Sequence, residues 1–465
     1  MSHGARRIAL AAVAVCVCAG CRALPEPPTE PVAAKDGEFR IESGHGELGR
    51  RAARALVARI AADPAGGDAL ARHLSIEQGV SPAPLFSSNS VRLLRDGEQT
   101  FPAMFAALKA ATHQIHLEYY IFEDIEWDGD RLSDVLLAKR AAGVEVNVIY
   151  DSVGSSSTPR EFLDRLRQAG VRMLEYHPLN PAHGLRTVSL NDRDHRKLLV
   201  VDGARAIVGG VNMSHTYERA PATGAGSEAA VKENAPTHWR DTDAEILGPA
   251  VAELERLFVA HWTRESKEPV ATALEFPRLD AQGDQVVRII GSAPAHRQVH
   301  YYLTVLTAID SAREAIWLTT GYFVPTHRER ASLTAAAHRG VDVRLLVPSV
   351  SDSPAALTVQ RASYGDLLQA GVHIYEAQNV ILHSKSVVVD RVWSAIGSSN
   401  FDHRSALFND ELDAVIVGHS TAERLESLLR EDFAEARAVD RDAWRHRGVT
   451  ERLKEAWWRL WQTLL

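Results

Sequence analysis

Apolar runs alternate with amphipathic stretches along most of the chain, and this alternation predicts its secondary structure. The clearest apolar runs are Val144–Tyr150 and Val341–Val347, and each follows a stretch of helical character, at Asp130–Ala142 and Ala331–Arg339. A glycine separates each helix from the strand that follows, as is typical of a residue that ends a helix. Helices that alternate with buried strands indicate an α/β fold with a largely parallel or mixed sheet.

Two further apolar runs share a polar pattern. The run that starts at Lys197 is preceded by His195 and followed by Asp202, and both segments with this pattern read HxKxxxxD. The second copy consists of His383, Lys385 and Asp390, and its histidine lies 188 positions after the first (383 − 195). Three fixed residue types coincide by chance about once in 8,000 positions. Two copies in one chain therefore indicate a duplicated functional unit.

The duplication extends beyond the two motifs. A turn of small residues that ends in an asparagine follows each copy, and Asn212 and Asn400 are also 188 positions apart (400 − 212). Other segments match in pairs: Gln114–Leu117 with Ala315–Leu318, Gly143–Val146 with Gly340–Val343, and Gln168–Val171 with Gln369–Val372. This period is far too long for a solenoid. We therefore predict two similar α/β/α sandwich halves, related by an internal duplication with pseudo-twofold symmetry.

The duplication also sets the expected domain limits. We assign residues 84–275 to the first half and 276–440 to the second half. Before them come an export or lipoprotein-like signal at 1–21 and a tether with a helical region at 22–83. An amphipathic helix at 441–465 follows.

Alternation along a strand places the histidine and the lysine of each motif on the same face. The motif aspartates, Asp202 and Asp390, end their strands, where a carboxylate typically shapes the turn or pairs with a cation. A second acidic position recurs in the two halves, because Asp241 aligns with Glu411. A carboxylate there either orients an imidazole or is a solvated turn acid, and the sequence alone leaves both interpretations open.

These residues together resemble the phospholipase D superfamily and, within it, the bacterial cardiolipin synthases. The resemblance runs from about Pro84 to the end of the chain. Besides the two motifs, it rests on the segments Asn89–Gly97, His116–Phe122 and Trp239–Asp243. The paired motifs with their asparagine turns are specific for the superfamily and less specific for the substrate.

The resemblance implies a two-step transfer through a phosphohistidine. His195 is expected to attack phosphorus, and His383 to protonate the leaving alcohol and then deprotonate the acceptor. Asp241 is expected to orient His195, and Glu411 to orient His383. The non-bridging phosphate oxygens are expected to contact Lys197, Lys385, Asn212 and Asn400. Asp202 and Asp390 complete the two catalytic motifs and are expected to support the site structurally.

No metal or other cofactor is expected. The chain has 20 histidines, but none has the spacing of an HExxH or Cys/His zinc site. Fixed lysines can stabilise the charge that a phosphodiester develops in its transition state. The net charge of −8 argues against general nucleic-acid binding, and no glycine-rich nucleotide loop is present. The expected partners are a phospholipid substrate and a membrane surface, and one chain carries both motifs, so a monomer suffices.

The chain ends bear on the compartment. Arg6 and Arg7 precede a short apolar run, which is typical of a bacterial export signal. Cys21 is the expected lipidation site, which would anchor the protein to the membrane with its catalytic part in the periplasm. The segment Ala220–Pro236 is expected to be a surface loop. Trp457 and its neighbours form a stripe that either lies at a membrane interface or packs on the core.

The leading functional hypothesis is a phosphatidyl transferase that makes cardiolipin from two phosphatidylglycerol molecules and releases glycerol. The first alternative is a phospholipase D that hydrolyses phospholipid to phosphatidic acid. The second is a catalytically inactive lipid-binding lipoprotein. Products distinguish the first two, because they differ only in whether an alcohol or water accepts the phosphatidyl group.

Overall fold

The computed structural model describes residues 40–62, 66–178, 191–218, 238–270, 279–296, 298–351 and 353–448, with the single positions 24, 450 and 457. The expected signal, the lipidation site Cys21 and the loop Ala220–Pro236 lie outside these residues, as do positions 449, 451–456 and 458–465 of the expected C-terminal helix, whose described beginning is helical only over Arg441–Arg445. Within the described ranges, no helix has the length and apolar character needed to cross a bilayer.

The first half is built on a seven-stranded section of sheet. Its strands pair in the order β8-β7-β4-β9-β10-β12-β3, with parallel pairs at β8-β7-β4 and antiparallel pairs elsewhere. The bounds are β3 (Leu85–Arg95), β4 (Gln114–Tyr119), β7 (Glu145–Asp151), β8 (Arg172–Tyr176), β9 (Lys197–Val201), β10 (Arg205–Gly209) and β12 (Thr242–Leu247). The first HxKxxxxD motif contributes β9, in the middle of this section.

The second half repeats the pattern strand for strand. Its order is β17-β16-β14-β19-β20-β22-β13, with the same parallel and antiparallel pairs. The bounds are β13 (Gln285–Ser292), β14 (Ala315–Thr319), β16 (Asp342–Pro348), β17 (His373–Ala377), β19 (Ser386–Val389), β20 (Trp393–Gly397) and β22 (Glu411–Val417). The second motif contributes β19, the counterpart of β9. The identical strand order confirms the predicted duplication.

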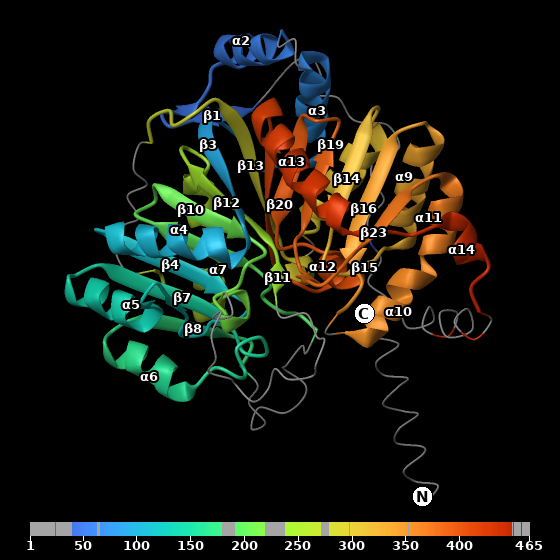
Figure 1. The fold of residues 1–465 in the computed structure, drawn as a ribbon. Helices are drawn as coiled ribbons and strands as arrows, with labels where there is room; N and C mark the ends of the chain where they lie inside the picture. The colour runs from blue at the N-terminus through green and yellow to red at the C-terminus, as the bar shows by residue number, and fades with distance from the viewer. Residues whose placement is uncertain are drawn as a thin grey trace, which may run out of the picture.

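Strands β3 and β13 pair antiparallel and join the two sections into one large sheet. The halves therefore lie side by side, with the first at the left and the second at the right in Figure 1. Helices cover both faces of each half, so the predicted α/β/α architecture is confirmed. In the first half these are α4 (Asp96–Ala110), α5 (Leu132–Ala141), α6 (Arg160–Gln168) and α7 (Val251–Ser266).

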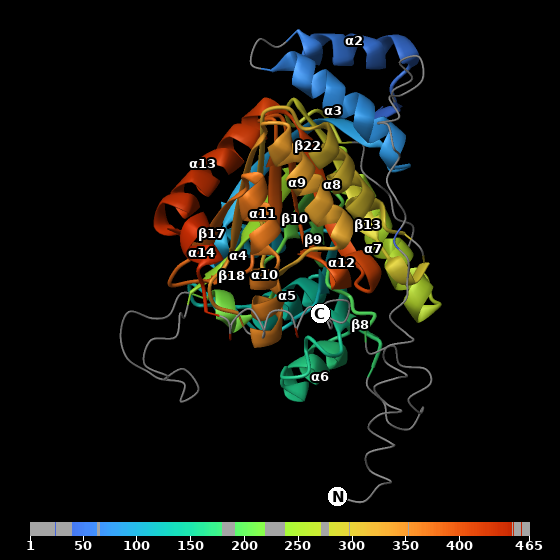
Figure 2. The ribbon, with the colours of Figure 1, turned by 90° about the vertical axis from the view of Figure 1, so that its right-hand side faces the viewer.

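The second half has an equivalent set of helices. They are α8 (His300–Ser311), α9 (His327–His338), α10 (Pro354–Ala362), α11 (Tyr364–Ala370), α12 (His403–Leu407) and α13 (His419–Glu435). The turned view shows α13 on one face of the sheet and α8 on the other (Figure 2). The apolar side chains of α7 and α13 share one core with strands of both halves, which fixes the halves against each other.

The elements around the two expected helices match the sequence pattern. Gly143 and Gly340 follow α5 and α9 with φ of +89° and +88°, a backbone region that favours glycine. Helix α9 begins at His327, four residues earlier than expected. The reason is a capping box, in which the Thr326 side chain accepts from the Glu329 backbone and the Glu329 carboxylate accepts from the Thr326 backbone.

An N-terminal segment packs on the second half. It contains β1 (Ile41–Ser43), β2 (Gly46–Glu47), α2 (Arg50–Ala61) and α3 (Gly67–Val80), and it lies at the top of Figure 1. From α3, Glu77 accepts from buried Arg288 at 2.9 Å and from the Trp393 indole at 2.8 Å. Short elements complete the chain: β5 (Glu126–Trp127), β6 (Asp130–Arg131), η3 (His215–Tyr217), β11 (Trp239–Arg240), η4 (Pro294–His296), β15 (Phe323–Val324), β18 (Ile381–Leu382), β21 (Phe401–Asp402), β23 (Arg437–Ala438) and α14 (Arg441–Arg445).

Two short connections cross between the halves and determine the site. Strand β11 of the first half pairs in parallel with β18 of the second, which directly precedes the second motif. Its counterpart is a parallel bridge between Asp194 and Asp410, directly before the first motif. The backbone amide of His383 donates to the carbonyl of Arg240, and that of His195 donates to the carbonyl of Asp410. Each motif histidine is thereby held beside the acidic segment of the other half.

Candidate active site

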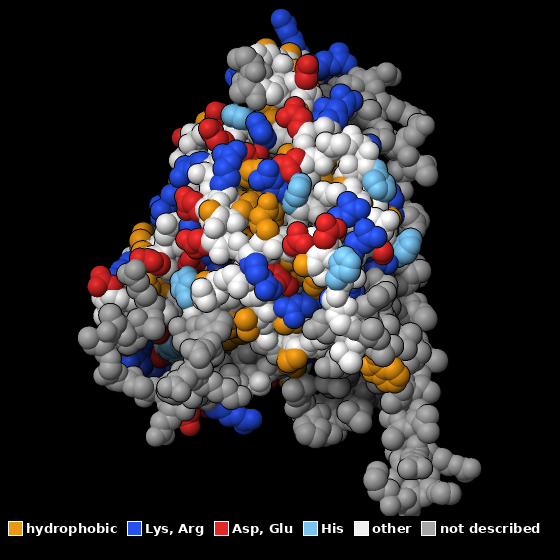
Figure 3. Space-filling model, turned by 45° about the vertical axis from the view of Figure 1, so that its right-hand side comes forward, with side chains coloured by type: hydrophobic (Ala, Val, Ile, Leu, Met, Phe, Trp, Pro, Cys, Tyr) orange, Lys and Arg blue, Asp and Glu red, His pale blue; other side chains and the backbone are white. Residues whose placement is uncertain are grey.

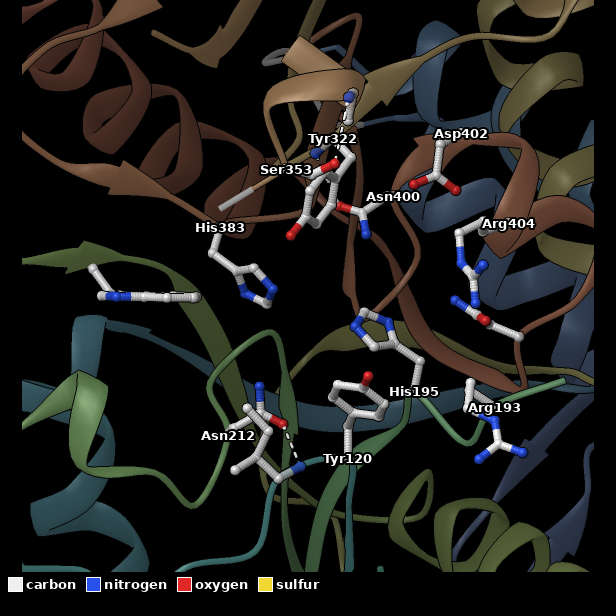
Figure 4. A pocket seen from close by; sticks show the side chains of 14 residues that line it. Tyr120, Arg193, His195, Asn212, Tyr322, Ser353, His383, Asn400, Asp402 and Arg404 are labelled. Carbon is white, nitrogen blue, oxygen red and sulfur yellow. Dashed lines mark hydrogen bonds between the residues drawn. The ribbon is translucent and has the colours of Figure 1, made fainter. Parts of the chain in front are cut away.

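The two motif histidines face each other across one cavity between the halves. Their ring centroids lie 6.3 Å apart, and the rings meet at 72°. Both side chains are largely buried and line a cavity of about 360 Å³. Figure 4 shows His195 and His383 pointing toward one another, with Asn212 and Asn400 on either side of them. Residues 188 positions apart in the chain thus share one composite site.

Each histidine is paired with a carboxylate, and the pairing is crossed. His195 Nδ1 lies 3.1 Å from Glu411 Oε2, and His383 Nδ1 lies 2.7 Å from Asp241 Oδ2. The prediction that Asp241 orients His195 and Glu411 orients His383 is therefore wrong. The cause is the backbone exchange described above, which places each acidic segment beside the motif of the other half. The carboxylates do orient the imidazoles, and the alternative of solvated turn acids is excluded, because neither carboxylate is exposed.

The carboxylate of Glu411 is held by three further hydrogen bonds. Glu411 accepts from the hydroxyls of Ser398 at 2.5 Å and Ser405 at 2.8 Å, and from the Asn409 amide at 3.3 Å. Because Nδ1 of each ring faces its carboxylate, Nε2 is the nitrogen left for chemistry in the cavity.

The pair of Asp241 and His383 has a further neighbour in Tyr217. The Tyr217 hydroxyl lies 3.1 Å from Asp241 Oδ2 and 3.0 Å from His383 Nδ1. The sequence did not identify Tyr217, since it belongs to neither motif. Its position 24 residues before Asp241 gives no sign of the contact. It distinguishes the environment of His383 from that of His195, whose Nδ1 instead lies 3.1 Å from the backbone carbonyl of Ser398.

The motif lysines are buried next to the histidines. Lys197 Nζ donates to the carbonyl of His195 at 2.5 Å, and Lys385 Nζ donates to the carbonyl of His383. The Lys197 ammonium also lies 5.4 Å from the centroid of the Tyr120 ring. Burial lowers the pKa of Lys197 to about 7, and an anion bound in the cavity would favour its charged form.

The two asparagines line the cavity in equivalent positions. Asn212 Oδ1 accepts from the backbone amide of Ile121 at 3.1 Å, and Asn400 Oδ1 accepts from that of Tyr322 at 3.3 Å. With each oxygen occupied in this way, the NH₂ group is the donor that each side chain can offer to a ligand. The sequence prediction that they contact phosphate oxygens stays a prediction.

Gly210, in the turn before Asn212, must be a glycine because the Asp241 side chain approaches it closely. A β-carbon at Gly210 would lie 2.0 Å from Asp241 Oδ1. At Gly397 in the second half, a β-carbon would lie 2.1 Å from Asp413 Oδ1. The small residues before each asparagine therefore make room for the acidic strand that carries the orienting carboxylate.

Burial and neighbouring charges shift both histidines toward the neutral form. Burial lowers the pKa of His195 well below its ordinary value, and the ammonium groups of Lys197 and Lys385 lower it further. Burial and Lys385 lower the pKa of His383 to about 4, although Asp241 opposes the shift. A neutral imidazole is the form that can act as a nucleophile or a base.

The two orienting carboxylates differ in charge. Burial tends to raise the pKa of Asp241, but His383 and Lys385 outweigh burial and lower that pKa to about 2. Burial raises the pKa of Glu411 to about 7, against the opposing effect of Lys197. Asp241 is thus ionised at neutral pH and favours a protonated His383. Glu411, with a pKa near 7, is only partly ionised at neutral pH.

The motif aspartates lie at strand ends, where they bind backbone. Asp202 accepts from the backbone amides of His113 and Gln114, both at 2.8 Å. Asp390 accepts from the backbone amide of Arg313 at 3.0 Å and lies 3.3 Å from His73 Nε2 in α3. Both aspartates have positive φ, 52° and 50°. Asp390 also pairs with the Arg72 guanidinium at 2.5 Å. Both aspartates therefore shape a turn, and Asp390 pairs with a cation as well, in agreement with what the strand pattern indicated.

A buried charged cluster lies behind the first motif. Oxygen and nitrogen atoms of Glu118, Asp194 and His261 approach within 4.8 Å of one another. The Arg196 guanidinium lies 3.3 Å from both Glu118 Oε1 and His261 Nδ1, so the cluster already includes its own cation. Arg196 also donates to the backbone carbonyl of Glu411 at 3.3 Å. The cluster therefore supports the segment that carries the carboxylate of His195.

Among the described residues, basic and acidic side chains are mixed on the face shown in Figure 3, where Lys and Arg lie interspersed with Asp and Glu. This distribution accords with the net charge of −8.

Comparisons with known proteins agree with this site. A family described as "Cardiolipin synthase, PLD-like domain" matches residues 104–220 and 305–433, one match in each half. Cardiolipin synthase A of Pseudomonas aeruginosa is 38% identical over 358 residues, which cover 76% of this chain and 69% of that protein. A probable cardiolipin synthase of Bacillus subtilis is 31% identical over 385 residues, 82% of this chain and 73% of that protein.

A solved structure shows the same fold at low sequence identity. The phosphatidylserine synthase of Haemophilus influenzae superposes with a TM-score of 0.64 and 12% identity, covering 85% of this chain and 100% of that one. At that identity the likeness concerns the fold alone.

Proposed function

The chain belongs to the cardiolipin synthase family with phospholipase D-like domains, and from this membership we propose that it joins two phosphatidylglycerol molecules into cardiolipin and releases glycerol. It is a phosphatidyltransferase of the phospholipase D type. The observation that carries the proposal is the pair of histidines 6.3 Å apart in one cavity, each with its own buried carboxylate. A transfer in two steps needs two such groups.

In the first step, His195 Nε2 attacks the phosphorus of the donor lipid. A P–N bond forms as the P–O bond to the head-group glycerol breaks, and His383 gives its proton to the departing oxygen. Asp241, ionised and 2.7 Å from His383 Nδ1, stabilises the protonated form that this step requires. The lysines and asparagine amides stabilise the charge on the non-bridging oxygens.

In the second step, the head-group hydroxyl of another phosphatidylglycerol attacks the same phosphorus. His383 takes the hydroxyl proton as the new P–O bond forms and the P–N bond to His195 breaks. The enzyme returns to its starting protonation state, so neither a metal ion nor another cofactor enters the balance. If water takes the place of the second lipid, the product is phosphatidic acid.

Product analysis tests the proposal. Purified protein is incubated with vesicles of phosphatidylglycerol, and the lipids and glycerol are quantified by mass spectrometry. Cardiolipin and glycerol in equal amounts support the proposal, whereas phosphatidic acid without cardiolipin identifies a hydrolase. Absence of any turnover supports an inactive lipid-binding protein.

We further propose that the protein works at a membrane in the bacterial cell envelope, anchored by a lipid on Cys21 and facing the periplasm. A phospholipid substrate and the apolar run after Arg6 and Arg7 support this location. The test is a Cys21→Ser variant expressed in bacteria. Loss of the protein from the membrane fraction is expected, and unchanged membrane association would contradict a lipid anchor at this residue.

A further inference from the structure

The two halves differ where the walls of the cavity rise beside the two histidines. The duplication relates Arg193 to Ile381, each two residues before its motif histidine. It likewise relates Asn409 to Trp239, each two residues before the orienting carboxylate, and Arg404 to Thr216, each four residues after the cavity asparagine. At these three positions the half-site of His195 has two arginines and an asparagine, whereas that of His383 has Ile381, Trp239 and Thr216. We call Arg193, Arg404 and Asn409 the cationic wall.

The cationic wall borders the cavity itself. Arg193, Arg404 and Asn409 all line it. Figure 4 shows Arg193 and Arg404 on the side of His195 that faces away from His383. On the opposite wall, the Trp239 ring lies 5.3 Å from the His383 ring, centroid to centroid, and presents an aromatic surface.

Arg404 makes no ion pair within the described part of the chain, and the carboxyl that feels its charge is Asp402, which lines the same cavity and whose pKa burial raises to about 6. Its guanidinium donates to the backbone carbonyl of Asn191 at 3.4 Å, and no carboxylate of the described residues lies within ion-pair distance. Arg193 differs, because its Nη1 lies 3.6 Å from Asp151 Oδ1 and 3.3 Å from the Ser152 hydroxyl. Arg404 is therefore the stronger anchor for an anion, and Arg193 adds to the positive field.

Asn409 offers the complementary group. Its amide nitrogen donates to Glu411, while its buried carbonyl oxygen has no hydrogen-bond partner among the described residues. A buried acceptor without a partner is costly, and a ligand hydroxyl would satisfy it. An arginine beside an unfilled acceptor matches a group that carries both a phosphate and a hydroxyl.

We propose that the cationic wall is a second anion subsite, which binds the glycerophosphate head group of the acceptor lipid. This inference rests on the proposed function and adds to it how the second lipid is recognised. Arg404 binds the acceptor phosphate, and Asn409 accepts from the free glycerol hydroxyl. The donor phosphate occupies the space between the histidines, and only the three glycerol carbons separate it from the second phosphate in the product. The second anion must therefore bind within the same cavity, on one of its walls.

The test compares two acceptors that share one donor. The full-length protein in phosphatidylglycerol vesicles makes cardiolipin with a charged acceptor, and with labelled free glycerol it makes labelled phosphatidylglycerol with a neutral acceptor. Both reactions share the first step. The ratio of cardiolipin formed to labelled phosphatidylglycerol formed therefore reports acceptor recognition alone. For Arg404→Gln, we expect this ratio to fall by about ten- to hundred-fold, since a hydrogen bond to a charged group is lost.

Two further variants complete the design. Arg404→Lys keeps the charge and is expected to recover most of the ratio. Arg424→Gln, at an exposed position on α13 outside the cavity, is the matched control and should keep the wild-type ratio. A ratio for Arg404→Gln within about twofold of the control would overturn the subsite. If the wild-type protein exchanges glycerol but forms no cardiolipin, the proposed function fails and the subsite fails with it.

Discussion

The crossed pairing of histidines and carboxylates predicts different defects for two conservative substitutions. Asp241→Asn removes the charge that lies 2.7 Å from Nδ1 of His383, the proposed acid. Glu411→Gln alters the group 3.1 Å from Nδ1 of His195, the proposed nucleophile. The first substitution should therefore impair protonation of the leaving alcohol, and the second should impair attack on phosphorus.

The size of the Asp241→Asn effect follows from the contact. A hydrogen bond to a charged group contributes about 1.5–3 kcal/mol, which corresponds to a loss of about ten- to hundred-fold in kcat/KM. Burial lowers the pKa of His383 to about 4, and Asp241 opposes that shift. Without the carboxylate the pKa of His383 falls further, so less of the acid is protonated. The alkaline limb of the kcat/KM profile should consequently move to lower pH.

The assay uses two substrates that differ in their leaving group. Phosphatidylglycerol releases an alcohol that needs a proton, whereas a nitrophenyl phosphodiester releases a phenolate that does not. The Asp241→Asn loss should shrink with the nitrophenyl substrate, and the Glu411→Gln loss should be similar with both. If the nitrophenyl substrate instead restores Glu411→Gln and leaves Asp241→Asn impaired, the assigned roles are reversed. Equal losses for Asp241→Asn on both substrates would refute its action through the acid.

Three further predictions concern the surroundings of the site. A β-carbon at position 210 would lie 2.0 Å from Asp241 Oδ1 and would push that carboxylate out of place. Gly210→Ala should therefore show the same dependence on the leaving group as Asp241→Asn in the same assay, and a wild-type dependence would contradict this. Asp390→Asn should lower the free energy of unfolding by about 2–4 kcal/mol in urea at pH 7, since it weakens the contacts to α3 and to the backbone. Burial alone would raise the pKa of Asp390, but hydrogen bonds from His73 and the backbone lower it. Its stabilisation is therefore complete above about pH 4 and lost as the pH falls toward the folded-state pKa, a dependence that the variant should lack. Dialysis against EDTA should leave cardiolipin formation unchanged, and loss of activity that added metal restores would contradict the metal-free mechanism.

The fold could be predicted from the sequence because the duplication repeats it twice. Matched segments such as Gln114–Leu117 and Ala315–Leu318 became β4 and β14, each parallel to the next strand of its own half. The small-residue turns before Asn212 and Asn400 marked where the acidic strands approach. Patterns of this kind are local, and local patterns survive in a single sequence.

The pairing across the halves could not be predicted in the same way. Alignment of the halves relates Asp241 to Glu411 but does not say which histidine each contacts. The resemblance implied Asp241 for His195, within the same half, whereas the true partner, Glu411, lies 216 positions away in the other half. Tyr217 was missed for the same reason, since its contacts with Asp241 and His383 depend on segments that only the folded chain brings together.

Covalent transfer through the composite site is tested most directly by trapping the phosphohistidine intermediate. Labelled phosphatidylglycerol is mixed with the protein, quenched in alkali within a turnover, and the peptides are analysed by mass spectrometry. We predict a phosphatidyl group on the peptide that contains His195, absent from the His195→Ala variant. Cardiolipin formation with the label on His383, or with no labelled histidine at all, would contradict the account.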